Sequence, residues 1–314
     1  MNWKRSIKKW ALLYCCLLAH CSWGQQLPER SILGGQDFML NPAMTASTEG
    51  LQIGAIFRQQ WLGFSGAPST TNLTLEIPLD EQRMGWGLWL EQDDQAGLQR
   101  YQLGGSYRYT IRPNWWEKDR LSWGLYGQMT WARLNGNDFI VKEEEDPLLL
   151  EGQGQALATN AGFGFLYTTN YQPDLFESAV YFGFAIQQAI PGTIEFLDEV
   201  PFSPFKQVRH FNAHLGAAFH NDFGQIEPSL WLHFLRGNLS QLDFNLKMNL
   251  QDLWRVGFRF SSNSLFVIRM GYRLSNVGGF DHELWIGAAT HFALHALRAS
   301  LPPSLELILT YQFE

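Results

Sequence analysis

Apolar and polar residues alternate along most of this chain with a period of two. The stretch 242–250 is among the most regular examples, because large apolar residues occupy every second position and polar or charged residues lie between them. The apolar positions are Leu242, Phe244, Leu246 and Met248, and the polar ones are Asp243, Asn245, Lys247 and Asn249. Successive side chains of a β-strand point to opposite faces, so this pattern predicts a strand with one apolar and one polar face.

Similar stretches recur from residue 51 to the end of the sequence, with turn residues between them. They cover 51–61, 71–77, 86–90, 101–109, 121–131, 160–167, 178–188, 211–219, 226–234, 242–250, 254–260, 265–272, 284–292 and 304–313. The stretch 178–188 is nearly apolar on both faces, which indicates that something inside, such as a plug, covers its inner face. About 14 strands of this kind predict an all-β fold, a transmembrane antiparallel β-barrel whose two ends lie on the same side of the membrane.

Composition favours a barrel in lipid over a soluble β-sandwich. Aromatic residues make up 15% of the chain, which contains 13 tryptophans and 29 glycines. After the N-terminal region, no apolar run approaches the roughly 18 residues that a membrane-spanning helix needs. A soluble sandwich also alternates, but a polar second face and large aromatics near strand ends are typical of barrels with aromatic girdles at the membrane interfaces.

The first 24 residues have the features of a secretory signal peptide. Four basic residues precede an apolar run at 10–19, and the small residues Ser22 and Gly24 occupy the positions expected before a cleavage site. The alternative is a lipoprotein anchored through Cys21, which requires a small residue before the cysteine, where this chain has His20. The sequence therefore predicts a signal peptide at 1–24 and export of the remaining chain.

Cysteine usage and charge narrow the function classes further. All three cysteines lie within the first 24 residues, so the mature chain would contain neither a disulfide nor a thiolate site. Removing this segment deletes four basic residues and no acidic one, which takes the formal charge from −7 to −11. Because phosphate backbones are bound by clustered Lys and Arg, nucleic acid is not expected as a partner.

The region between residues 41 and 87 carries a set of short motifs. They are Asn41-Pro42-Ala43, Arg58-Gln59-Gln60-Trp61, then Gly66, Pro68 and Thr70, and later Pro78 ahead of Gly85 and Gly87. Together they resemble the N-terminal pattern of the PorP/SprF family of outer-membrane proteins, which belongs to the type IX secretion and gliding machinery of Bacteroidetes. This chain departs from the pattern at Thr45-Ala46-Ser47, where relatives usually carry a glycine.

The resemblance implies a domain organisation and a role. The signal peptide would be followed by a periplasmic lead-in or plug at 25–50 and by one barrel at 51–314, surrounded by outer-membrane lipid. Such a barrel would be no enzyme and would need no cofactor. It would dock lipoprotein or peptidoglycan-linked components of the type IX machinery, or assist export and surface anchoring of a cognate secreted protein. A passive porin or channel in the same membrane is the alternative.

Six residues of the motifs are candidates for a partner-binding or structural role. They are Asn41, Pro42, Arg58, Trp61, Gly66 and Pro68. Asn41-Pro42 predicts an extended or turn conformation, since proline fixes its own φ and restricts the preceding residue. Trp61 is expected to anchor at the membrane interface and Arg58 to join a luminal ion pair, or both shape the loop 63–68 for a partner protein.

Charged residues of the later strands fall on the face opposite the apolar stripe. They are Asp243, Arg255, Arg259, Arg269, Arg273 and Glu283, together with Lys247 and with Glu76 of an earlier strand. One interpretation is a charged lumen that guides a passenger. The other is a set of salt bridges that fills a closed barrel, because a charge facing lipid costs about 2–4 kcal/mol and is driven inward whatever the function.

Three other chemistries have weaker support in the sequence. His210 and His214 share a strand face, but a separation of about 13 Å is too large for both to ligate one metal ion. The acidic connection 134–155 lacks the spacing of a calcium loop and is expected to be a long extracellular loop. An embedded hydrolase needs a converging nucleophile, base and orienting group, and the chain has no Gly-x-Ser-x-Gly motif.

Overall fold

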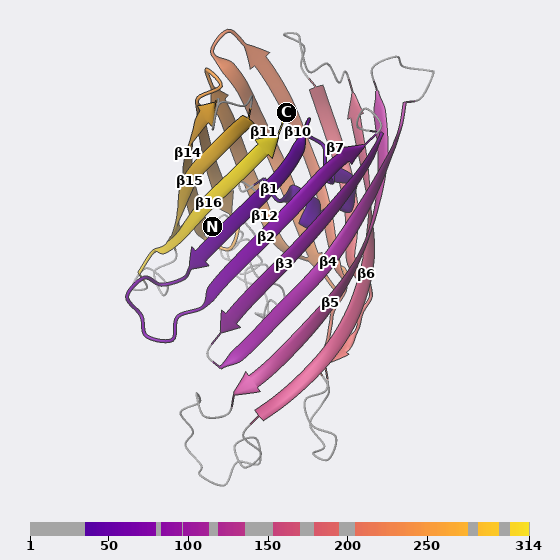
Figure 1. The fold of residues 1–314 in the computed structure, drawn as a ribbon, viewed down its shortest axis with the longest axis vertical. Coiled ribbons are helices and arrows are strands. Elements are labelled where there is room, and N and C mark those ends of the chain that lie inside the picture. The colour runs from indigo at the N-terminus through magenta and orange to yellow at the C-terminus, as the bar shows by residue number, and fades with distance from the viewer. Residues whose placement is uncertain are drawn as a thin grey trace, which may run out of the picture.

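The computed structural model describes residues 35–79, 83–95, 97–112, 119–135, 153–169, 179–194, 205–275, 282–294 and 302–313. Within these residues, fourteen antiparallel strands form a closed barrel (Figure 1). The fold class and the strand number predicted from the alternation are therefore confirmed. The predicted signal peptide and most of the acidic connection 134–155 lie outside the described residues.

The strands follow one another around the barrel in chain order. They are β1 (Leu51–Gln59), β2 (Ser69–Leu79), β3 (Met84–Gln95), β4 (Leu98–Ile111), β5 (Arg120–Asn135), β6 (Gln153–Thr169), β7 (Ala179–Ile190), β10 (His210–Asn221), β11 (Gly224–Leu235), β12 (Asn238–Leu250), β13 (Trp254–Ser261), β14 (Leu265–Ser275), β15 (His282–Ala293) and β16 (Ser304–Phe313). Two short strands, β8 (Thr193–Ile194) and β9 (Phe205–Lys206), form a separate sheet in the connection between β7 and β10.

The first and last strands close the barrel. β1 pairs with β16 from Leu51 opposite Phe313 to Gln59 opposite Leu305. The barrel therefore begins and ends at the same end, at the top of Figure 1, while the long connections after β5 and β7 leave from the opposite end. Closure pairs every strand edge, which lipid requires because it offers no hydrogen-bonding partner to free backbone groups.

The outer wall is apolar and the inner wall is polar, as the alternation predicts. On β12, Phe244 is 50% exposed on the outside, while its neighbours Asp243 and Asn245 are fully buried. On β16, Leu307 is 50% exposed and Glu306 is 1% exposed. Apolar side chains thus face the hydrocarbon of the membrane, and charged groups stay in the lumen.

Aromatic side chains lie on the outside near both ends of the barrel. Near the end that carries the first and last residues of the barrel, the rings of Trp86 and Tyr107 have their centroids 5.0 Å apart. Towards the opposite end, Tyr101 and Trp131 stack with centroids 5.3 Å apart. Rings at these levels are suited to the two membrane–water interfaces.

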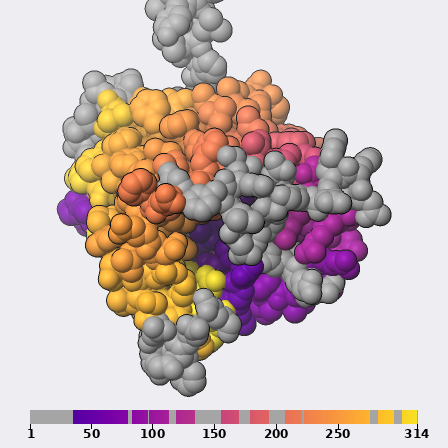
Figure 2. Space-filling model, turned by 90° about the horizontal axis from the view of Figure 1, so that it is seen from above, coloured from indigo at the N-terminus to yellow at the C-terminus, as the bar shows by residue number. Residues whose placement is uncertain are grey.

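Residues 35–50 lie inside the barrel, and we call them the luminal plug. Two single 3₁₀ turns form its centre, η2 (Asp37–Met39) and η3 (Pro42–Met44), and η3 packs against β4, β5 and β6. The indigo coils of this segment lie within the barrel in Figure 1, and indigo atoms lie between the orange and magenta walls in Figure 2. The stretch predicted to need an inner cover, β7, therefore has the plug beside it.

The buried apolar residues of the barrel form small clusters instead of one large core. One cluster joins the plug to the wall, where Phe38 and Met39 pack on Trp89 of β3, and the Phe38 and Trp89 ring centroids lie 6.0 Å apart. In the part of the chain that the structure describes, no helix is both long enough and apolar enough to cross a membrane.

Candidate functional site

The motif Asn41-Pro42-Ala43 forms the turn at the centre of the plug. Asn41 is extended, and its Oδ1 accepts a hydrogen bond of 3.0 Å from the Ala43 N–H, which makes it the N-cap of η3. Pro42 follows at the first position of the turn, where its missing N–H costs nothing. The Thr45 hydroxyl donates to the Pro42 carbonyl oxygen at 2.8 Å and closes the turn. The sequence thus encodes the turn locally.

Asn41 also fixes the plug to two strands of the wall. Its Nδ2 donates to the Phe165 carbonyl oxygen of β6 at 3.0 Å and lies 2.9 Å from Nε2 of His214 on β10. Because the amide nitrogen is a donor, Nε2 of His214 must accept, which places the ring proton on Nδ1. The imidazole stacks on Trp231 with ring centroids 4.2 Å apart. Asn41 is fully buried, and its amide nitrogen serves this attachment while its amide oxygen caps the turn.

Glycines of the inner wall make the room for the plug. A Cβ atom at Gly124 of β5 would lie 2.1 Å from the Pro42 carbonyl carbon, and one at Gly164 of β6 would lie 2.0 Å from Asn41 Oδ1. A Cβ at Gly87 of β3 would meet Phe38 at 2.9 Å. No side chain fits at these positions, so the plug lies directly against the backbone of the wall.

Charged and hydroxyl groups hold the C-terminal part of the plug to β2 and β4. The Ala46 N–H donates to Glu76 Oε2 at 2.6 Å, and the Ala46 carbonyl oxygen accepts from the Arg108 guanidinium at 2.9 Å. The hydroxyls of Thr45 and Ser106 are 2.9 Å apart. Thr45 and Ala46, at the departure from the family pattern, are therefore part of the attachment.

The opposite wall holds the N-terminal part of the plug. Gln187 of β7 donates to the Met39 carbonyl oxygen at 2.6 Å, and Lys247 of β12 donates to Asp37 Oδ2 at 2.6 Å. Burial raises the pKa of the Asp37 carboxyl from its usual value, and the Lys247 ammonium opposes that rise. The plug is thus attached on both sides of the lumen.

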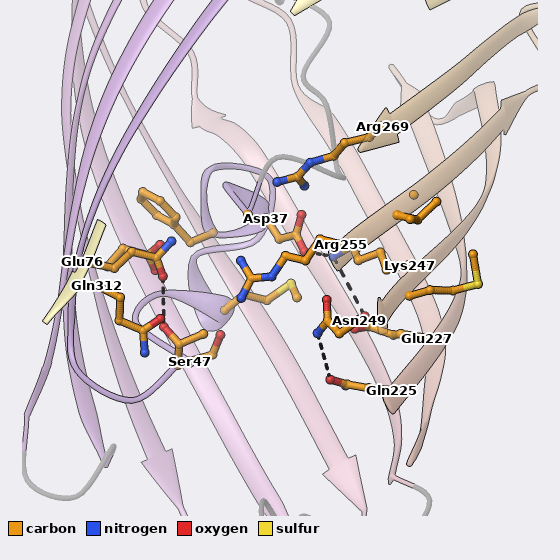
Figure 3. Close-up of a pocket in the computed structure, with 18 residues that line it drawn as sticks. Asp37, Ser47, Glu76, Gln225, Glu227, Lys247, Asn249, Arg255, Arg269 and Gln312 are labelled. Atoms are coloured by element: carbon orange, nitrogen blue, oxygen red, sulfur yellow. Dashed lines mark hydrogen bonds and ion pairs between the residues drawn. The ribbon is translucent and has the colours of Figure 1, made fainter. Parts of the chain in front are cut away.

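A polar cavity of about 330 Å³ lies between the plug and the wall formed by β11 to β14 (Figure 3). Its charged lining comprises Asp37, Glu76, Glu227, Lys247, Arg255 and Arg269. Amide side chains complete the polar lining, among them Gln225 and Asn249, which are joined by a hydrogen bond of 3.2 Å. Three of the six predicted luminal charges of β12 to β14, namely Lys247, Arg255 and Arg269, line this cavity beside the plug.

The predicted luminal charges fall into two groups. Arg259 and Asp243 form a buried ion pair of 2.8 Å, and Arg273 pairs with Glu283. These pairs agree with the interpretation of salt bridges that fill a closed barrel. Arg255 and Arg269 instead point into the cavity. The sequence placed all six residues on one face but did not distinguish the two groups.

The other four motif residues, Arg58, Trp61, Gly66 and Pro68, lie in or near the loop between β1 and β2. This loop is at the end of the barrel opposite to its first and last residues. Arg58 is 6% exposed inside the barrel and lies opposite Glu306 across the β1–β16 pair. Trp61 has a positive φ of 44°, and Gly66, with a φ of 73°, turns the loop back. The Pro68 carbonyl oxygen accepts from Gln60 N–H at 2.9 Å and closes it. The six candidate residues therefore form two separate sites, and Asn41 and Pro42 alone belong to the plug.

Several wall residues of the site have no specific signal in the sequence. His214, Gln187 and Ser106 face inward by alternation, but only the fold shows that they meet the plug. The inward glycines at 124 and 164 were a usable signal, because a glycine in a strand often marks close approach of another backbone. Within the described ranges, no three His, Cys, Asp or Glu side chains are grouped so that they could hold a metal ion.

A closed fourteen-strand barrel with an apolar outside and a plugged polar lumen defines an outer-membrane β-barrel protein. Residues 24–311 match the family described as type IX secretion system membrane protein PorP/SprF, and the chain belongs to that family. The protein is located in the outer membrane, and its family membership implies interaction with the secretion machinery.

Two solved barrel structures are similar to this chain. The CymD monoaromatic hydrocarbon channel matches with a TM-score of 0.53 at 11% identity, over 92% of this chain and 95% of that chain. A Pseudomonas aeruginosa FadL homologue matches with a TM-score of 0.49 at 9% identity, over 89% of this chain and 94% of that chain. A comparison with curated proteins finds no match. At 11% identity the likeness to the CymD channel shows the fold alone.

Proposed function

We propose that this protein is a non-enzymatic docking component of the type IX secretion and gliding machinery. In this role it connects lipoprotein or peptidoglycan-linked components of the periplasm to the outer membrane, and it assists export and surface anchoring of a cognate secreted protein. Family membership supports the link to secretion. The filled lumen supports docking at the ends of the barrel over diffusion of solutes through it.

The observation that carries this proposal is the attachment of the plug on opposite sides of the lumen. Asp37 is held by Lys247 of β12, and the Ala46 N–H is held by Glu76 of β2, each at 2.6 Å. Hydrogen bonds to charged groups contribute about 1.5–3 kcal/mol each, so the plug does not swing aside freely. A passive porin instead has a water-filled lumen.

The loop between β1 and β2 offers a surface for a protein partner at the other end of the barrel. Phe64 is 59% exposed and Leu62 is 40% exposed, and the Phe64 and Trp61 rings lie edge to face with centroids 6.5 Å apart. The loop is closed by its own backbone hydrogen bonds, from Phe64 N–H to Trp61 and from Gln60 N–H to Pro68. Rigid exposed aromatic residues of this kind are common at the centres of protein interfaces.

Co-purification tests the proposal. The tagged barrel is extracted from native membranes in mild detergent, and the proteins that accompany it are identified by mass spectrometry, with an unrelated tagged outer-membrane barrel as the control. Recovery of periplasmic type IX components, or of one large secreted protein, supports docking and names the partner. A barrel that emerges alone, under conditions in which known membrane complexes survive, contradicts it.

A further inference from the structure

Two arginines of neighbouring strands point into the luminal cavity from the same side. Arg255 of β13 lies opposite Gly271, and Arg269 of β14 lies opposite Gly257, so the two arginines are diagonal neighbours in the sheet. Diagonal neighbours are about 7–8 Å apart at their Cα atoms, within reach of one small ligand. Figure 3 shows both side chains extending from the wall towards the plug.

The carboxylates around the cavity already have other partners. Asp37 accepts from Lys247 at 2.6 Å, and Glu227 accepts from the Tyr181 hydroxyl at 2.6 Å. Glu76 accepts from the plug backbone at Ala46. Two nearby arginines that do not line the cavity form ion pairs with carboxylates, Arg259 with Asp243 and Arg273 with Glu283.

No carboxylate in the described part of the chain forms an ion pair with Arg255 or Arg269. Arg269 is only 9% exposed, and its Nε–H has no hydrogen-bond partner among the described residues. Burial of a charged group without a partner is costly, and two neighbouring guanidinium groups also repel each other. The lining carboxylates Asp37, Glu76 and Glu227 are thus engaged with other groups, and neither arginine has a carboxylate within ion-pairing distance in the described part of the chain.

The geometry of Arg255 suits a planar or tetrahedral anion. Its guanidinium carbon lies 3.6 Å from the centroid of the Trp285 ring, and this stacking holds the guanidinium plane while its N–H groups stay free for a ligand. Guanidinium forks bind carboxylate and phosphate oxygens with two parallel hydrogen bonds. Asn249, directly opposite Arg255 across the β12–β13 pair, adds an amide to the same lining.

We propose that this cavity is an oxoanion-binding site, in which the carboxylate or phosphate group of a small solute lies between Arg255 and Arg269. The volume of about 330 Å³ accommodates a small anion and its water. Asp37 and Phe38 of the plug line the same cavity, so a bound anion contacts both the wall and the plug. This site is independent of the proposed docking function.

Calorimetric titration of the folded barrel tests the site. The protein is prepared in detergent without phosphate or carboxylate buffers, and inorganic phosphate and succinate are titrated separately, with chloride at matched ionic strength as the blank. Saturable binding of phosphate or succinate is expected, and the probe that binds identifies the preferred oxoanion. Arg269→Gln should weaken the binding at least tenfold, while Arg209→Gln, at an exposed arginine near the opposite end, should leave it unchanged.

Asn249→Asp keeps the test decisive if Arg269→Gln does not fold. This nearly isosteric change places a carboxylate opposite Arg255, so it supplies a partner for that arginine from within the protein. We expect the variant to fold and to lose at least nine-tenths of the affinity for the anion. Absence of saturable binding to the native barrel, or equal affinity in the native barrel and Asn249→Asp, would overturn the proposal.

Discussion

The side-chain amide nitrogen of Asn41 lies 2.9 Å from Nε2 of His214, although 173 positions separate the two residues in the sequence. This contact joins a single turn in the lumen to the middle of a barrel strand. Asn41 Oδ1 accepts from Ala43 N–H at the same time, so one side chain both shapes the plug and attaches it. The attachment of the plug therefore depends on the identity of this residue.

Asn41→Ala is expected to loosen the plug without unfolding the barrel. The change removes the cap of η3 and leaves the Phe165 carbonyl oxygen and the His214 ring without their partner. Loss of a cap and of buried hydrogen bonds lowers the stability of the docked plug by about 2–4 kcal/mol. Hydrogen exchange of the amides in residues 35–50 should accelerate at least about thirtyfold, since each 1.4 kcal/mol is a factor of ten. Ser47→Ala, at an exposed position of the plug, should change little, and equal protection in both variants would rule out this role of Asn41.

Gly124→Ala is expected to displace the plug by a steric clash. The new Cβ would lie 2.1 Å from the Pro42 carbonyl carbon, so the plug backbone or the strand backbone must move. Gly127→Ala on the same strand is the control, because a Cβ there meets nothing within 4 Å. The readout is the labelling rate of a cysteine introduced at Ala43, which is fully buried. The barrel is refolded from a chain that starts at residue 25, so it contains no other cysteine. Labelling should be faster with Gly124→Ala alone, and similar rates in both variants would contradict the close packing.

Phe244→Arg tests which face of the wall meets lipid. Phe244 is half exposed on the outside of β12, near the middle of the strand. Arginine on the lipid face at the bilayer midplane costs about 2–4 kcal/mol, so the fraction that folds into lipid vesicles should fall. Lys247→Arg, which keeps a cation inside the lumen, should fold like the native chain. If Lys247→Arg lost as much folding yield as Phe244→Arg, the facing assignment of β12 would be wrong.

Phe64→Ser tests the loop between β1 and β2 as a docking surface. Phe64 is 59% exposed beyond the end of β1, at the end of the barrel opposite to its first and last residues, so its replacement should leave the barrel intact and reduce the recovery of the cognate secreted protein in a co-purification. Phe223→Ser is the matched control, since Phe223 is 72% exposed in the turn between β10 and β11 at the opposite end. Unchanged recovery with Phe64→Ser, measured by quantitative mass spectrometry, would remove this loop from the proposed interface.

The sequence predicts the strands of this barrel well because alternation is a local property. Whether a residue such as Phe244 or Asp243 faces outward or inward follows from its neighbours alone. The number of strands then follows from counting the alternating stretches, and the pairing of the first strand with the last follows from closure, which lipid imposes on any spanning sheet. Closure thereby predicts one long-range contact, the pairing of β1 with β16, from the sequence alone.

The site is less predictable because it depends on contacts between distant segments. The sequence singled out Asn41 and Pro42, but it could not show that they lie against Gly124 and Gly164. Arginines 255, 259, 269 and 273 share one face by alternation, yet which of them pair with acids depends on side chains of four strands and the plug. Periodicity thus predicts the inner face, and the three-dimensional arrangement decides which inner residues act together.

Ion conductance of the purified barrel in planar bilayers tests the plugged lumen most directly. The native chain and a variant that lacks residues 35–50 are compared under identical salt and voltage, after circular dichroism has shown the same β-sheet content in both. We predict that the native barrel stays closed and that the deletion variant conducts steadily, because the plug is held from both sides of the lumen. Equal, steady conductance of the two proteins would contradict a sealed lumen and favour a passive porin.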